Sequence, residues 1–248
     1  MAVLVSLQRF RLSDQIVDLL AGEIISGRLQ ADESLPSEPQ LVERFRASKV
    51  VIRESIQKLA GLGLIRVSWG KRTVVLDERE WNILAAPVQR AYVEAGRAVE
   101  LLTHLYEARL IVEPAAAEHA AARATADERD DLLTIVKEMR AISTGSHDTQ
   151  RFLKVDRDFH DAVARMGRNA ALRAVLRDLH ATMSQRWLNS KITPAELEVL
   201  VGQHQKVAEA IRLGDRNGAR AAMAEHIAWA ADLETSRAAR EASHDPLS

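Results

Sequence analysis

Apolar residues recur at helical spacing along most of the chain, beginning with a segment from Ser13 to Ile25 that Gly27 can close. Ser37 and Gln40, three residues apart, form a capping box for a second short helix. A third helix follows a four-residue turn, with an apolar face for the core and a polar face for solvent. Its apolar face comprises Ile52, Ile56 and Leu59, and its polar face comprises Lys49, Arg53 and Gln57.

Two β-prone runs, Leu64–Val67 and Thr73–Leu76, follow the third helix. The residues that join them are Ser68, Trp69, Gly70 and Lys71, which predict a hairpin with a basic tip. Three helices followed by a hairpin, with cations on the third helix and at the tip, describe a winged helix-turn-helix. We assign this domain to residues 8–78.

Cations gather on the same segment. The whole chain has a formal net charge of −1, but the stretch from Arg44 to Arg72 holds eight basic residues and one acidic residue. A solvated surface would explain such a run, but here the cations coincide with the recognition helix and the hairpin tip, which favours binding to a polyanion. The start of the third helix would enter the major groove, where Arg53 can bond a guanine edge and Lys49 a guanine or a phosphate. Gly70 would let the hairpin approach the minor groove.

The remainder of the chain is predicted to be entirely helical, so the fold class is mainly α. Residues 79–97 are expected to hold a linker and the first helix of a second domain, and residues 98–238 an all-α bundle. The expected helices are Glu100 to Arg123, Thr125 to Gly145, Asp148 to Gly167, Ala171 to Arg186, Thr193 to Gly214 and Asp215 to about Glu234, with a frayed polar tail after Arg237.

Composition excludes several classes of protein. The chain has 248 residues, enough for two domains, and no cysteine, which excludes disulfides, thiolate metal ligands and a cysteine nucleophile. No apolar run approaches the length of a membrane span, and the apolar start Met1–Leu7 is too short for a signal peptide. We therefore expect a cytoplasmic protein with no membrane partner.

Four residues in the helical half form a candidate metal-binding site. Asp156 and His160 lie four residues apart on one helix face, and His204 and His226 occupy inward-facing positions on two later helices. A single such histidine would indicate a hydrogen-bonded core residue, but one carboxylate with three imidazoles favours a divalent metal. Zinc is the default for a nitrogen-rich site, and nickel, manganese, iron and cobalt remain open.

The N-terminal pattern resembles the GntR family of bacterial transcription regulators over roughly Leu12 to Leu76. The resemblance implies DNA contacts at the positions of Arg53, Lys49 and the hairpin glycine Gly70, and Ser37, Ser48, Trp69 and Lys71 belong to the same expected DNA-facing set. Two departures stand out: Pro39 replaces a common arginine, and bulky Trp69 precedes the hairpin glycine. The motifs are Leu35-Pro36-Ser37-Glu38, Ser48-Lys49-Val50-Val51-Ile52-Arg53-Glu54, Gly63-Leu64-Ile65, and Gly70 before Thr73-Val74-Val75.

The helical half is similar to the FCD subgroup of the same family. That resemblance implies that Asp156, His160, His204 and His226 hold a divalent metal in an effector-binding domain. The other histidines match nothing in the pattern and are assigned to the surface or to packing: His104, His119, His147, His180 and His244. The supporting motifs are Glu107-Ala108-Arg109 with Glu113-Pro114, and Asp156-Arg157-Asp158-Phe159-His160.

These patterns predict a ligand-responsive repressor that binds a near-palindromic operator as a homodimer and is not an enzyme. The effector is expected to be a small carboxylic acid on the metal, with Arg109, Trp187 and Asn189 lining its site. Arg109 could instead form a structural salt bridge with Glu113. The segment 80–84 looks like one in regulators of sugar-acid breakdown, which makes a sugar acid the first candidate and leaves hydroxy acids and dicarboxylates open.

Two alternatives remain open at this point. A metal with four protein ligands could be purely structural and close the site to any effector. A zinc ion with three histidines could also activate water, which would make the domain a metallohydrolase attached to a DNA-binding module. Against hydrolysis, the sequence contains no His-Glu-x-x-His pattern and no distinct general base.

Overall fold

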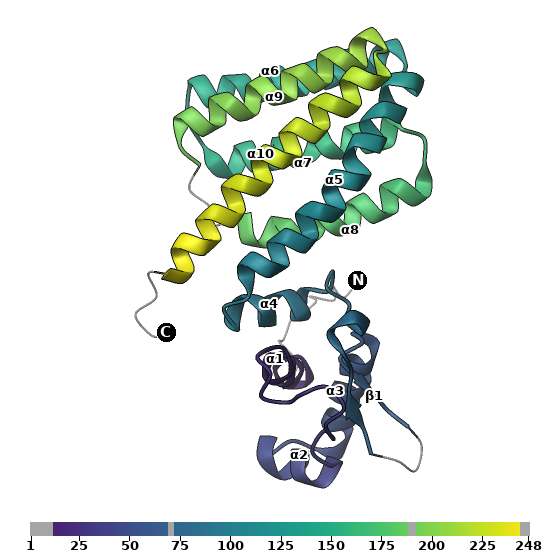
Figure 1. Cartoon of the computed structure of the whole chain (residues 1–248), viewed down its shortest axis with the longest axis vertical. Helices are drawn as coiled ribbons and strands as arrows, with labels where there is room; N and C mark the ends of the chain where they lie inside the picture. The colour runs from purple at the N-terminus through teal and green to yellow at the C-terminus, as the bar shows by residue number, and fades with distance from the viewer. Residues whose placement is uncertain (1–11, 69–71, 188–191, 244–248) are drawn as a thin grey trace, which may run out of the picture. The chain divides into compact units, whose positions relative to one another are not determined.

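The computed structural model describes residues 12–68, 72–187 and 192–243, with the side chains of 182–187 and 242–243 excepted. Contacts between residues divide the chain into two compact units, Met1–Leu101 and Leu102–Ser248 (Figure 1). The mainly helical fold class is confirmed, because ten α-helices and one two-stranded sheet account for the regular structure of the described residues. None of the described helices is long and apolar enough to cross a membrane.

The N-terminal unit is the predicted winged helix-turn-helix. Its elements are α1 (Leu12–Ile25), α2 (Glu38–Phe45), α3 (Lys49–Gly61), β1 (Ile65–Arg66), β2 (Val74–Val75), the 3₁₀ turn η1 (Glu78–Glu80) and α4 (Ala86–Glu94). Helix α3 packs against both α1 and α2, and β1 pairs antiparallel with β2 (Figure 1). The core of this unit is aliphatic, and Leu20, Leu41, Ile52, Leu59 and Leu64 are completely buried.

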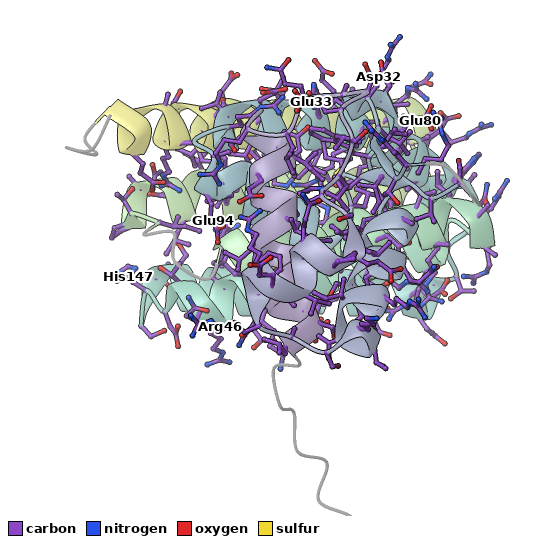
Figure 2. All side chains as sticks on the ribbon, turned by 90° about the horizontal axis from the view of Figure 1, so that it is seen from below. Asp32, Glu33, Arg46, Glu80, Glu94 and His147 are labelled. Atoms are coloured by element: carbon purple, nitrogen blue, oxygen red, sulfur yellow. The ribbon has the colours of Figure 1, made fainter. Side chains whose placement is uncertain are left out.

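Local signals in the sequence set the starts of α2 and α3. The capping box of Ser37 and Gln40 is present, and the Ser48 hydroxyl accepts a hydrogen bond from the Val51 amide at 3.3 Å. Two non-glycine residues in turns, Asp32 (φ 67°) and Arg46 (φ 49°), adopt the left-handed conformation, and both lie at the rim of the view in Figure 2. Both side chains are exposed to solvent.

Gly63, just after α3, is a position that only glycine can occupy. It combines φ of 72° with a close approach to η1, so that a Cβ atom would lie 2.0 Å from the Glu80 carbonyl oxygen. Any other residue would push η1 away from the end of α3. The close contact at Gly63 therefore sets the position of η1, which follows the hairpin, relative to the end of α3.

The segment 79–97 packs with the N-terminal unit. Helix α4 lies against α1, and Arg90 pairs with Asp18 on that helix at 2.7 Å. Arg97 bonds the carboxylate of Glu78 at 2.8 Å and the Ile25 carbonyl at 3.2 Å. By these contacts the segment 79–97 belongs to the N-terminal unit.

The C-terminal unit is a bundle of long helices. They are α5 (Ala98–Arg123), α6 (Ala126–Thr144), α7 (Thr149–Met166), α8 (Ala170–Trp187), α9 (Pro194–Leu213) and α10 (Arg216–Ser243). Helix α9 packs against both α6 and α10, and α7 packs against α6 and α8 (Figure 1). The predicted capping boxes at Thr125 and Thr193 are present, so those two helices begin where the sequence indicated.

The prediction that the last helix ends near Glu234, with a frayed tail after Arg237, was wrong. Helix α10 continues to Ser243, and Ala238 is buried. Arg237 pairs with Glu234 one turn earlier at 2.9 Å and with Glu196 at the start of α9 at 2.5 Å. These ion pairs and the lack of glycine or proline between 219 and 245 keep the helix intact.

Candidate metal centre and DNA-facing surface

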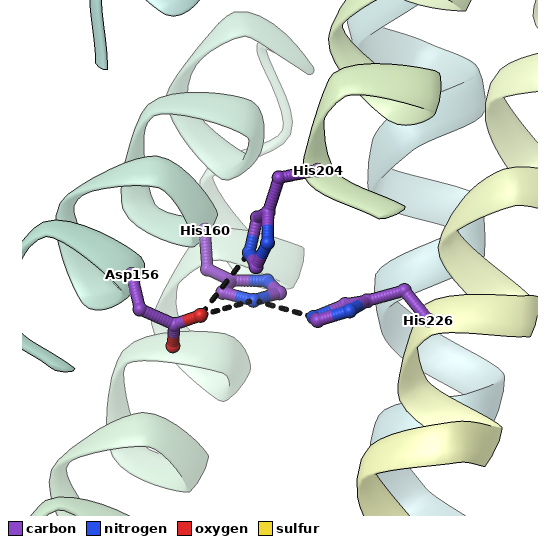
Figure 3. A group of neighbouring side chains, drawn as sticks. All are labelled: Asp156, His160, His204 and His226. Atoms are coloured by element: carbon purple, nitrogen blue, oxygen red, sulfur yellow. Dashed lines mark hydrogen bonds and ion pairs between the residues drawn. The ribbon is translucent and has the colours of Figure 1, made fainter. Parts of the chain in front are cut away.

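The four residues singled out from the sequence meet inside the C-terminal bundle. Asp156 and His160 come from α7, His204 from α9 and His226 from α10, and their side chains turn toward one another (Figure 3). All four side chains are buried, and His204 is completely inaccessible to solvent. One potential ligand atom from each residue lies within 4.8 Å of the others. This spread suits a single ion surrounded by the four groups.

The Nε2 atoms point inward. His204 Nε2 lies 3.1 Å from Asp156 Oδ1, and His160 Nε2 lies 3.2 Å from His226 Nε2 and 3.9 Å from Asp156 Oδ1 (Figure 3). His204 Nε2 has no well-aligned hydrogen-bond partner among the described residues. A buried nitrogen in that position is costly unless something else satisfies it.

The Nδ1 atoms point outward, each at an oxygen. His204 Nδ1 lies 2.8 Å from the Leu200 carbonyl, and His226 Nδ1 lies 3.1 Å from the Gln203 side-chain oxygen. His160 Nδ1 lies 2.5 Å from Glu113 Oε2. The Leu200 carbonyl and the Gln203 oxygen favour protons on Nδ1 of His204 and His226, and the Glu113 carboxylate lies beside Nδ1 of His160 although the contact lacks hydrogen-bond alignment. In this tautomer three Nε2 lone pairs face one another and a carboxylate. Such a set repels itself when empty and binds a divalent cation well, so the residues fit a metal.

Electrostatics favour the metal-binding forms of His160, His226 and Asp156. Burial lowers the pKa of His226 well below its ordinary value, and the neighbouring His204 and His160 lower it further. Burial also lowers the pKa of His160, which outweighs the opposite effect of Glu113. Burial raises the pKa of Asp156, but the contact with His204 and the charges of the other histidines lower it more, so the pKa falls below its usual range. Neutral imidazoles and an ionised carboxylate are the forms that bind metals.

Glu113 on α5 joins the cluster to its surroundings. Besides His160, its carboxylate contacts Arg109 Nε at 2.5 Å and His180 Nε2 at 3.1 Å. Burial raises the pKa of Glu113, but Arg109, His160 and His180 together bring it well below the ordinary value. The salt bridge between Arg109 and Glu113, one of the two roles considered for Arg109, is therefore present, and both side chains are buried.

His180 had been assigned to the surface or to packing, and the structure places it instead beside Glu113. Glu113, His160 and His180 also lie close enough to hold an ion. The separation of 2.5 Å between His160 Nδ1 and Glu113 Oε2 leaves no room for a cation between them, and the Arg109 guanidinium would repel one. We therefore interpret Glu113 and His180 as outer contacts of the centre in Figure 3.

Four of the residues expected to face DNA lie in the described part of the N-terminal unit, and all four are exposed. Lys49 and Ser48 stand at the start of α3, and Ser37 at the start of α2, all exposed to solvent. The Arg53 side chain is 67% exposed, and its Nε donates to Glu38 at 3.0 Å. A hollow of about 1180 Å³ lies beside them, lined by residues that include Ser37, Glu38, Arg53, Gln57, Arg72 and Thr73.

Several residues named from the sequence, His244 among them, lie outside the described residues. Trp69, Gly70 and Lys71 at the hairpin tip and Asn189 lie outside the described residues, and the Trp187 side chain does as well. Their expected roles stay predictions.

Two sequence profiles of known domains match the chain. The profile of the gntR family of bacterial regulatory proteins matches residues 12–75, and the profile of the FCD domain matches residues 104–228. The chain belongs to the GntR family. It is a transcriptional regulator of the GntR type with an FCD domain, and not an enzyme. GntR regulators bind operator DNA, and the FCD match covers all four residues of the buried cluster.

Curated GntR regulators resemble the chain over most of its length. The galactonate operon transcriptional repressor of Escherichia coli (strain K12) is 28% identical over 220 residues, covering 87% of this chain and 93% of the relative. The regulator LutR of Bacillus subtilis (strain 168) is 27% identical, covering 85% and 95%. The repressor NanR of Enterobacter sp. (strain 638) is 29% identical, covering 89% and 84%.

Solved structures share the GntR fold. The structure of Lar, which controls expression of the Listeria monocytogenes agr system, aligns with a TM-score of 0.58 at 18% identity, covering 93% of this chain and 99% of that one. The E. coli McbR/YncC structure aligns with a TM-score of 0.53 at 18% identity, covering 92% and 99%. At this identity the likeness concerns the fold alone.

Proposed function

We propose that this regulator holds a divalent metal, with zinc as the first candidate, through Asp156, His160, His204 and His226, and that a small carboxylic acid binds the metal as effector. The observation that carries the proposal is the inward convergence of three Nε2 atoms and one carboxylate oxygen, each imidazole having an oxygen at its Nδ1. Nickel, manganese, iron and cobalt accept the same donors.

The charge of the loaded centre supports an anionic effector. One carboxylate and three neutral imidazoles leave a dication with a net charge near +1, and a metal that takes five or six ligands keeps open positions for an oxygen anion. Arg109 is the candidate second contact for the acid, since it is buried near Asp156 and Glu113. The name of the galactonate operon repressor supports a sugar acid as the first class to test.

Operator binding by a homodimer completes the proposal. One winged helix-turn-helix presents few base contacts, so two half-sites are needed for the specificity of a regulator. An acid that prefers one packing of the bundle would shift the protein toward it and change the spacing of the two recognition helices. Release of the operator, and therefore relief of repression, is the expected response.

The first test measures coupling between acid and DNA. DNA sites selected from random duplexes by the metal-loaded protein serve as probe, and D-galactonate, L-lactate and a dicarboxylate as acids. We expect an acid that raises the melting temperature to weaken binding to the selected site by about tenfold, a coupling of about 1.4 kcal/mol. An acid that raises the melting temperature and leaves DNA affinity unchanged would refute the coupling. Metal that stabilises the fold while no acid binds would favour the purely structural alternative.

A second prediction concerns Glu113. The Glu113→Gln variant keeps the size of the side chain but removes the charge that faces His160 Nδ1, so we expect metal affinity to fall by about 10- to 100-fold. Competition with a chelating dye would measure the dissociation constant. Glu107→Gln, at an exposed position on the same helix, is the matched control and should change nothing. Equal affinities for wild type and Glu113→Gln would show that the carboxylate does not support the ligand.

A further inference from the structure

The Tyr106 hydroxyl is a buried polar group that forms no hydrogen bond in the described part of the chain. Tyr106 is 1% exposed, and its oxygen has no hydrogen-bond partner among the described residues. Buried hydroxyls in native proteins are nearly always bonded, so an exception calls for an explanation. Packing explains the ring but not the hydroxyl, because phenylalanine would fill the same space with no polar atom left over.

The surroundings of the hydroxyl belong to the proposed effector site. Tyr106, Arg109 and Glu113 follow one another on one face of α5, and the Arg109 guanidinium carbon lies 5.1 Å from the centroid of the Tyr106 ring. The hydroxyl also interacts electrostatically with Asp156, one of the four inward-facing residues of the metal centre. The ring of Tyr106 therefore packs against the candidate acid-binding arginine, and the charge of the candidate ligand Asp156 affects its hydroxyl.

The Tyr106 hydroxyl is protonated and can donate a hydrogen bond. Burial raises the pKa of Tyr106 far above its ordinary value; Arg109 opposes this, while Glu234, Asp156 and Glu113 raise the pKa further. The proton therefore stays on the oxygen throughout the physiological range. Arg109 Nε already donates a hydrogen bond to Glu113. Among the described residues, the Tyr106 hydroxyl has no acceptor for its proton.

We infer that the Tyr106 hydroxyl donates a hydrogen bond to the bound effector and selects acids that carry an oxygen besides the carboxylate on the metal. The inference rests on the proposed effector site and narrows its ligand to hydroxy acids, including polyhydroxy sugar acids. A plain alkanoic acid offers Tyr106 only the carboxylate that already binds the cation, whereas a hydroxy acid adds a separate oxygen acceptor. A site built to bond a hydroxyl discriminates against ligands that lack it.

The test compares two probes and two variants. L-lactate and propionate differ by one hydroxyl, and their dissociation constants for the zinc-loaded protein are measured by calorimetry, with D-galactonate as a larger hydroxy acid. Wild type is expected to bind L-lactate or D-galactonate at least tenfold more tightly than propionate. Tyr106→Phe should bind the hydroxy acids about tenfold more weakly than wild type and propionate equally well.

Measurements without any acid separate this role from a structural one. Because the hydroxyl has no partner in the fold, Tyr106→Phe should melt at the same temperature as wild type or higher, with unchanged zinc affinity. Tyr92→Phe is the control: the hydroxyl of Tyr92, the other tyrosine of the chain, bonds Glu78, so its loss should lower the melting temperature and leave acid binding unchanged.

Each outcome decides the question. A lower melting temperature of acid-free Tyr106→Phe would show that a water or a protein group already satisfies the hydroxyl, and would overturn the inference. Unchanged discrimination between L-lactate and propionate would overturn it as well. If wild type, Tyr106→Phe and Tyr92→Phe all fail to bind the three acids, the proposed effector site does not take hydroxy acids. The role assigned to Tyr106 then fails with it.

Discussion

Replacing His226 by alanine is expected to lower zinc affinity by about a hundredfold or more. A four-ligand zinc site binds with about 10–16 kcal/mol, so one ligand accounts for about 3 kcal/mol. At about 1.4 kcal/mol for each factor of ten, this corresponds to two orders of magnitude. The His226 side chain is buried and points its Nε2 at the other ligands, so no surface residue can replace it.

Melting curves with and without EDTA would separate loss of metal from loss of packing. In wild type, zinc at a hundred times its dissociation constant should stabilise the folded state by about 2.7 kcal/mol, and EDTA should remove that gain. In His226→Ala and the bulkier His226→Gln the same treatment should have little effect. His104→Ala, at an exposed position of the same unit, is the control and should behave as wild type. An EDTA response that survives in both His226 variants would exclude the proposed centre.

Replacing Arg53 by alanine is expected to weaken binding to a selected DNA site by about 1–3 kcal/mol, roughly 10- to 100-fold. Arg53 is exposed on the recognition helix α3, where its guanidinium can reach a guanine edge, and Glu38 holds its Nε. Loss of a base contact should also relax the sequence preference, whereas loss of a phosphate contact would weaken all sequences alike. Fluorescence anisotropy on the selected site and on substituted duplexes measures both effects.

Arg79→Ala tests whether charge alone explains the result. The Arg79 side chain is 88% exposed on η1 and pairs with Asp77, so its replacement removes the same charge from the same unit at a position outside the recognition helix α3. A modest and uniform loss is expected. If Arg53→Ala weakened every duplex by the same factor as Arg79→Ala, Arg53 would not read a base.

The features that could be predicted from the sequence are those set by local chemistry. Ser48, Thr125 and Thr193 cap helices by bonding amides three residues away, so their positions are visible in the sequence. The spacing of Asp156 and His160 on one helix face is likewise local, and the burial of His204 and His226 follows from their apolar neighbours.

Contacts between distant segments could not be predicted in the same way. Glu113 meets His160 and His180 across three helices, and nothing in the spacing of these residues reveals it. The resemblance to the FCD group named Glu113-Pro114, but only the structure relates that carboxylate to a ligand. The end of α10 was misjudged for a similar reason, because Arg237 is held by Glu196, far away in the sequence.

Helices α9 and α10 are tied together along their length, which has a mechanical consequence for the bundle. Lys206 pairs with Glu225 at 2.8 Å, the rings of His204 and His226 lie 4.3 Å apart, and Arg237 clamps Glu196. We therefore expect α9 and α10 to tilt together as one rigid unit when their distance from Asp156 on α7 changes. The end of α10 at Ser243 lies 17 residues beyond His226, about 26 Å along the helix axis. A tilt of α10 by about 5° at His226 would therefore move Ser243 by about 2 Å.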